Sequence, residues 1–63
     1  MPNLYLKPED FSPQDVRLQT ASIKEAKAAI ERGDKVLIGY DREAPDHVLT
    51  TLTALEHFLK SRQ

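Results

Sequence analysis

Residues 22–40 read SIKEAKAAIERGDKVLIGY, and this stretch decides the fold because a helix pattern passes directly into a strand pattern. Ser22 and Glu25 have the spacing of a capping box, in which each side chain accepts a hydrogen bond from the other residue's backbone N–H. Apolar residues then recur at helical spacing on one narrow face, at Ile23, Ala26, Ala29 and Ile30. Gly33 is the residue type that ends helices in the left-handed conformation. The pattern predicts a helix over about 22–32.

A short apolar run from Val36 to Tyr40 follows this helix and predicts a strand. Because side chains alternate along a strand, Leu37 and Gly39 would point to one face and the other three residues to the opposite face. Both faces are apolar, which is typical of a central strand covered on two sides. We interpret Gly39 as room for a helix side chain, although a glycine in a strand also lets a backbone or a ligand approach closely.

The C-terminal segment, about 46–62, predicts a second helix with a broad apolar face. Its apolar residues step by four, three and four, at Val48, Leu52, Leu55 and Leu59. Pro45 and Asp46 suit the first turn of this helix. Residues 48–53 alone also fit a strand, and their threonines lower the helix propensity. The continued periodicity favours the helix.

The N-terminal third allows two interpretations around Ser12. Ser12 would cap a helix that starts at Pro13, with Phe11 and Val16 packed together as a hydrophobic staple. Alternatively, residues 16–20 form a strand that leads into the Ser22 cap. We favour the strand, and a single turn after Ser12 is compatible with it.

These elements predict one small α/β domain over residues 1–63, with an α+β arrangement as the alternative. Residues 1–15 form an irregular segment with a short strand over 4–6, which Pro8 ends because proline donates no ladder hydrogen bond. The expected order is β-α-β-α, in which two or three short strands pack with two main helices, over about 22–32 and 46–62.

Composition excludes several classes of protein. The chain has no cysteine, so it forms no disulfide and no thiolate zinc site, and we expect a cytoplasmic protein. No apolar run approaches the ~20 residues of a membrane helix. Nine basic residues balance ten acidic ones, which makes nucleic-acid binding unlikely because phosphate binders usually carry a basic excess.

No pattern for catalysis is found in the sequence. His47 and His57 would lie about 15 Å apart along one helix, too far to hold one metal ion. No serine stands in a Gly-x-Ser-x-Gly turn, and two glycines do not make a phosphate-binding loop. We therefore predict no catalytic residue, no metal and no cofactor, and we lean towards a protein that is not an enzyme.

The C-terminal end of the central strand is a candidate site for a small ligand. Ligands of parallel α/β sheets prefer that end. The candidate ligand-binding residues are Tyr40, Asp41, Arg42 and His47. A small-ligand or metal-binding accessory protein is therefore the alternative function.

The surplus of apolar side chains on the last helix indicates a partner. A narrow sheet is unlikely to cover all of the large residues on this helix, and a domain of this size has a limited core of its own. The predicted interface residues are Leu49, Leu52, Leu55, Phe58 and Leu59. The sequence favours a small cytoplasmic interaction or regulatory module that acts as a homodimer, as in small bacterial or phage proteins, with a protein partner also possible. A nucleic-acid-associated regulator is the second alternative.

Overall fold

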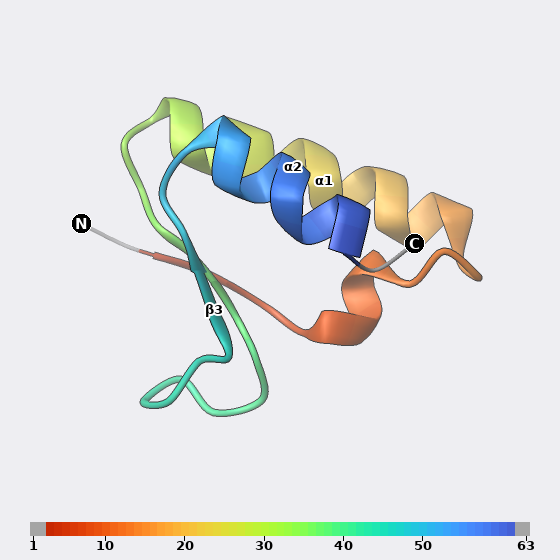
Figure 1. The fold of residues 1–63 in the computed structure, drawn as a ribbon, viewed down its shortest axis with the longest axis horizontal. Coiled ribbons are helices and arrows are strands. Elements are labelled where there is room, and N and C mark those ends of the chain that lie inside the picture. Colours follow the sequence, from red (N-terminus) through yellow and green to blue (C-terminus); the bar gives the residue numbers. More distant parts are fainter. Residues whose placement is uncertain (1–2, 62–63) are drawn as a thin grey trace.

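A mixed three-stranded sheet organises residues 3–61, the part of the chain that the computed structural model describes (Figure 1). β2 (Val36–Ile38) lies in the centre, parallel to β1 (Leu4–Leu6) and antiparallel to β3 (His47–Leu49). The element order β-α-β-β-α makes this a small α+β domain, and the predicted strands at 4–6 and in the centre of the sheet are confirmed.

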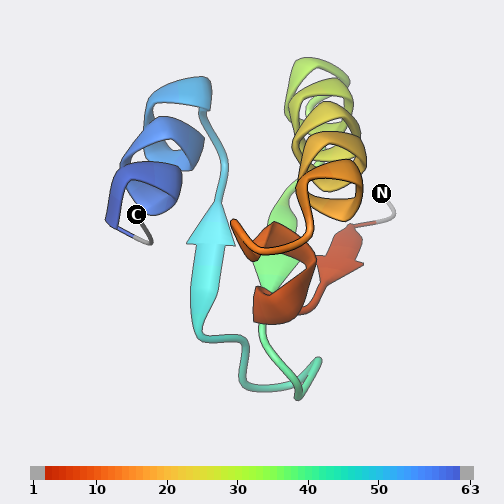
Figure 2. The same ribbon diagram turned by 90° about the vertical axis from the view of Figure 1, so that its right-hand side faces the viewer.

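Both helices lie on the same face of the sheet (Figure 2). α1 (Val16–Glu31) packs over β1 and β2, while α2 (Leu52–Ser61) packs against β3. Val36 and Ile38 point towards the helices and are fully buried. The expectation that the central strand is covered on both faces needs correction, because no helix of the described chain lies on the other face.

α1 begins six residues before the predicted cap, so the strand that we favoured over 16–20 is wrong. Asp15 caps the helix, and its Oδ1 accepts a hydrogen bond of 3.2 Å from the backbone N–H of Leu18. Ser22 is buried in the middle of the helix, where its small side chain fits. The predicted end is right, because Gly33 takes φ = 89° directly after the last turn.

The start of the last helix is also corrected. Residues 47–49 form β3, and α2 begins only at Leu52, where Thr51 Oγ1 accepts a hydrogen bond of 3.1 Å from the backbone N–H of Ala54. Pro45 and Asp46 lie in the loop before β3 rather than in a first helical turn. The physical reason is that β3 satisfies the second edge of β2, whose buried backbone groups need partners on both sides.

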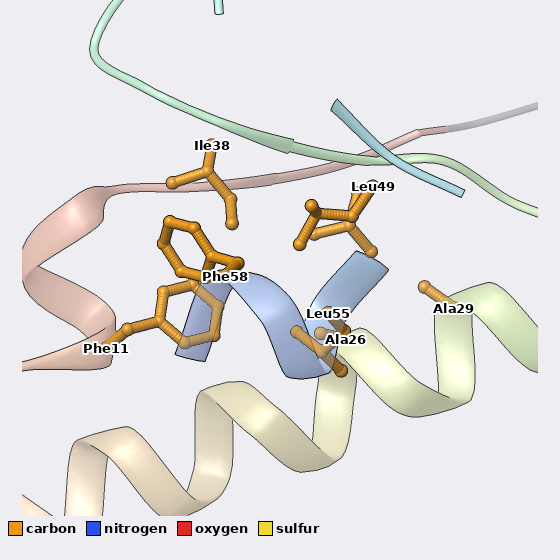
Figure 3. Packing of buried hydrophobic residues seen from close by; sticks show 8 residues of the cluster. Phe11, Ala26, Ala29, Ile38, Leu49, Leu55 and Phe58 are labelled. Atoms are coloured by element: carbon orange, nitrogen blue, oxygen red, sulfur yellow. The ribbon is translucent and has the colours of Figure 1, made fainter. Parts of the chain in front are cut away.

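The core lies between the helices and the sheet (Figure 3). Phe11, from the single 3-10 turn η1 (Pro8–Phe11), meets Phe58 of α2 edge to face, with ring centroids 5.2 Å apart. Ala26 and Ala29 are fully buried and let α1 lie close to the strands. The hydrophobic staple of the alternative helix interpretation does not form, because Phe11 is fully buried while Val16 is 65% exposed.

The caps of α1 can be tested with a pair of alanine variants. Asp15→Ala should lower the free energy of unfolding by about 1 kcal/mol, since it removes the N-cap acceptor. Ser22→Ala should leave that energy unchanged or raise it, because alanine has the higher helix propensity and no recorded hydrogen bond is lost. Urea unfolding followed by circular dichroism measures both, and a larger loss in Ser22→Ala would contradict this helix boundary.

The aromatic contact can be tested by a double-mutant cycle. Phe11→Leu and Phe58→Leu should each lower the free energy of unfolding by more than about 1 kcal/mol, with a coupling of about 0.5–1.5 kcal/mol from the lost ring pair. The exposed Val16→Ala serves as control and should change stability by less than about 0.5 kcal/mol. Strictly additive phenylalanine variants would show that the two rings do not interact.

Candidate functional site

An apolar groove with a volume of about 440 Å³ lies between α1 and α2. Leu55 forms its buried floor, at 1% exposure. Ile23 on one helix and Leu52 with Leu59 on the other form its apolar walls. Figure 2 shows α1 and α2 on the same face of the sheet, and the groove lies between them. Three charged side chains complete the lining: Lys27, Glu31 and Glu56.

Helical periodicity explains why these residues share the groove. Ile23, Lys27 and Glu31 are four residues apart and therefore form one stripe along α1. Leu52, Leu55 and Leu59 step by three and four along α2. The two stripes face each other because both helices rest on the same sheet, so the groove is apolar at its base and charged at its margins.

The predicted interface residues divide into two groups. Leu49, Leu55 and Phe58 are buried in the core of the chain itself, although Leu55 also reaches the floor of the groove. Leu52 is 42% exposed and Leu59 is half-buried, so these two are available at the groove surface. Sequence reasoning assigned Ile23 only to a helix face and missed its place in the groove, for which its i, i+4 spacing to Lys27 was the available signal.

A second, smaller concavity of about 140 Å³ lies at the carboxyl ends of β1 and β2. Its lining comes from both strands and from the loop that follows β2, namely Tyr5, Leu6, Lys7, Leu37, Gly39, Tyr40, Arg42 and Pro45. The Arg42 guanidinium carbon stands 4.8 Å from the centroid of the Tyr5 ring, a cation–π contact. Leu37 lies between Tyr5 and Val48 in the register of the sheet, on the face without helices.

The four predicted ligand-binding residues are only partly brought together. Tyr40 and Arg42 line the smaller pocket. Asp41 instead shapes the loop, because its Oδ1 accepts a hydrogen bond of 2.9 Å from the backbone N–H of Glu43. The His47 ring packs on Phe58 at 4.8 Å, on the helix side of the sheet. His47 lies on β3 rather than at the start of a helix, which explains why its ring is separated from the Tyr40 and Arg42 side chains.

Tyr5 and Lys7 also line this pocket, and sequence reasoning missed both. They are more than thirty positions from Tyr40 in the chain, and only the parallel pairing of β1 with β2 brings them near. The strand predicted at residues 4–6 was the available signal, since parallel strands place their carboxyl ends at the same edge of a sheet.

Within residues 3–61, no group of three His, Asp or Glu side chains is arranged to hold a metal ion. Across the same residues, no helix has both the length and the apolar character needed to cross a bilayer. Comparison of the chain with protein-family models, curated proteins and solved structures gives no match.

The loop beside the smaller pocket depends on Gly39. A Cβ atom at this position would lie 2.8 Å from the backbone nitrogen of Asp46 and 3.2 Å from the Cα of Pro45. The glycine therefore admits a backbone segment, rather than the helix side chain that we expected.

Gly39→Ala should lower the free energy of unfolding by about 1–3 kcal/mol, because backbone atoms must move to admit the methyl group. Amide NMR shifts should concentrate at residues 45–47. Gly33→Ala is the control, since no atom lies within 4 Å of its Cβ position and its cost comes from φ = 89° alone. A stable Gly39→Ala variant with an unchanged loop spectrum would contradict the close approach.

Proposed function

We propose that this chain is a small protein-interaction module that acts as a homodimer through the groove between α1 and α2. The observation that carries the proposal is the exposed apolar wall of the groove, where Leu52 is 42% exposed and Ile23 and Leu59 are half-buried. Removing apolar surface from water is worth about 25 cal/mol per Å², so these side chains favour a covering partner.

The dimensions of the helical layer support a second copy as this partner. α1 has 16 residues and is therefore about 24 Å long, and two helices side by side are about 20 Å wide. α2 has 10 residues and is about 15 Å long, so the projected area of the two helices is roughly 400 Å², about half of the ~800 Å² per partner of a standard interface. Three strands of three residues offer only about 10 by 14 Å on the other side of the sheet. A dimer through the helices therefore fits better than one through the open sheet.

The charges along the groove are compatible with twofold symmetry. An interface between identical surfaces must be self-complementary, and this rim carries both signs. Lys27 on α1 faces a lining that also contains Glu31 and Glu56. The ion pair recorded within residues 3–61 joins Arg32 and Asp34, so Lys27 is left to pair with a carboxylate across the twofold axis.

The small size of the chain adds a thermodynamic reason for dimerisation. A chain of 63 residues without cysteine has no disulfide to brace its small core. Dimerisation would add buried apolar surface and make stability depend on concentration. We place this module in the cytoplasm, on the basis of its cysteine-free composition.

A matched pair of leucine variants tests the interface. Leu52 and Leu18 are 42% and 40% exposed, and both lie in the first turn of a helix, where a glutamate suits the helix dipole. Only Leu52 lines the groove. Leu52→Glu should raise the dissociation constant of the dimer at least about tenfold, whereas Leu18→Glu should change it less than about twofold.

Sedimentation equilibrium measures both effects against the 7.2 kDa chain mass. The native chain should have twice that mass at high micromolar concentration. A native monomer under those conditions, or equal dissociation of the two variants, would overturn the proposal. Circular dichroism of both variants verifies that they remain folded.

A further inference from the structure

We infer that the pocket at the carboxyl ends of β1 and β2 binds a planar aromatic anion of single-ring size. This pocket does not depend on the proposed dimer, because its loop lies on the far side of the sheet from the groove (Figure 1). Its lining combines aromatic rings, an apolar floor and positive charge, and each of these features constrains the ligand.

The aromatic lining calls for a flat, apolar partner. Tyr5 is 40% exposed and Tyr40 is 70% exposed, so two large rings stand open to solvent around the buried Leu37. The guanidinium of Arg42 lies over the Tyr5 ring at 4.8 Å and extends the flat surface. Aromatic rings and guanidinium planes both stack with planar ligands.

The charge of the lining selects an anion. Lys7 and Arg42 are the charged residues that line the pocket, and both are positive. Neither is recorded in an ion pair within the described chain. The nearby carboxylate of Asp41 accepts the backbone N–H of Glu43 and is not part of the lining. A carboxylate or phosphate attached to the ring would therefore meet two cations, and the Asp10 carboxylate, whose Oδ2 accepts a hydrogen bond of 2.9 Å from the backbone N–H of Lys7, lies outside the lining.

Volume and position limit the ligand further. The pocket encloses about 140 Å³, close to the ~150 Å³ of a cavity that holds one benzene molecule. Lys7 follows β1 while Gly39 and Tyr40 follow β2, so the pocket is at the edge of the sheet where ligands of parallel strands usually bind. Because Gly39 has no side chain, the backbone of residues 45–46 lies close to that edge and narrows it.

Two sources of a single-ring aromatic anion are distinguishable by titration. Benzoate represents the free aromatic acids, and phenyl phosphate represents the aryl phosphates. Benzamide and phenol are the uncharged counterparts. Titration of the ¹⁵N-labelled full chain should give saturable shifts at the amides of Tyr5, Lys7, Gly39 and Tyr40 with at least one anion. Its uncharged counterpart should bind at least about tenfold more weakly, because the charge-assisted contacts are absent.

Substitution of each cation then tests its contribution to binding of the anion. Arg42→Gln and Lys7→Gln should each weaken binding of the anion about tenfold, while Arg17→Gln, an exposed arginine on α1, should not change it. Saturation by benzoate alone, by phenyl phosphate alone or by both supports the inference and identifies the source. No saturable shift, equal binding of the neutral compounds, or an equal loss in Arg17→Gln overturns it. Sedimentation of the same samples keeps this result separate from the test of the dimer.

Discussion

The backbone of β2 imposes the constraint on which the rest of the structure depends. All three residues of this strand are buried, so each of its N–H and C=O groups needs a hydrogen-bond partner on one edge or the other. β1 supplies the first edge in parallel and β3 the second in antiparallel orientation. Because residues 47–49 are drawn into the sheet, α2 is shorter than its apolar periodicity suggests, and it follows β3 directly onto the face that α1 already occupies.

Placing both helices on one face produces two different surfaces. On the helix side, the alanines of α1 allow close contact with the strands, and the Phe11–Phe58 pair fills the space towards α2. The apolar groove lies between the two helices, with Leu55 among its lining residues. On the other side, Tyr5, Leu37 and Val48 form a row across the sheet that no helix of the described chain covers.

The two proposals are geometrically compatible. A twofold dimer that pairs the helical layers would bury the grooves in its centre and leave the two open sheet faces on the outside. Each protomer would then present its Tyr5–Arg42 pocket to solvent, so ligand binding and dimerisation would not compete. The two proposed surfaces use different residues, because Leu52 and Leu59 line the groove while Tyr5 and Arg42 line the pocket.

Local sequence determined the elements whose signals are short in range: the strand at residues 4–6, the body of α1 and its end at Gly33, and the apolar strand that became β2.

Tertiary structure decided the rest of the fold and the composition of both surfaces. The sequence pattern indicated Ser22 as the cap, whereas Asp15 caps α1 because the helix extends back to Val16 and contacts η1, where the Gln19 side chain donates a hydrogen bond of 3.2 Å to the backbone oxygen of Phe11. Residues 48–53 fitted a strand as well as the favoured helix, and pairing with the second edge of β2 places residues 47–49 in a strand. Periodicity identified apolar leucines on α2, but only the sheet beneath them determined which face their own core and which face the groove. The meeting of Tyr5 and Lys7 with Tyr40 and Arg42 depends on pairing between distant strands, which no local pattern encodes.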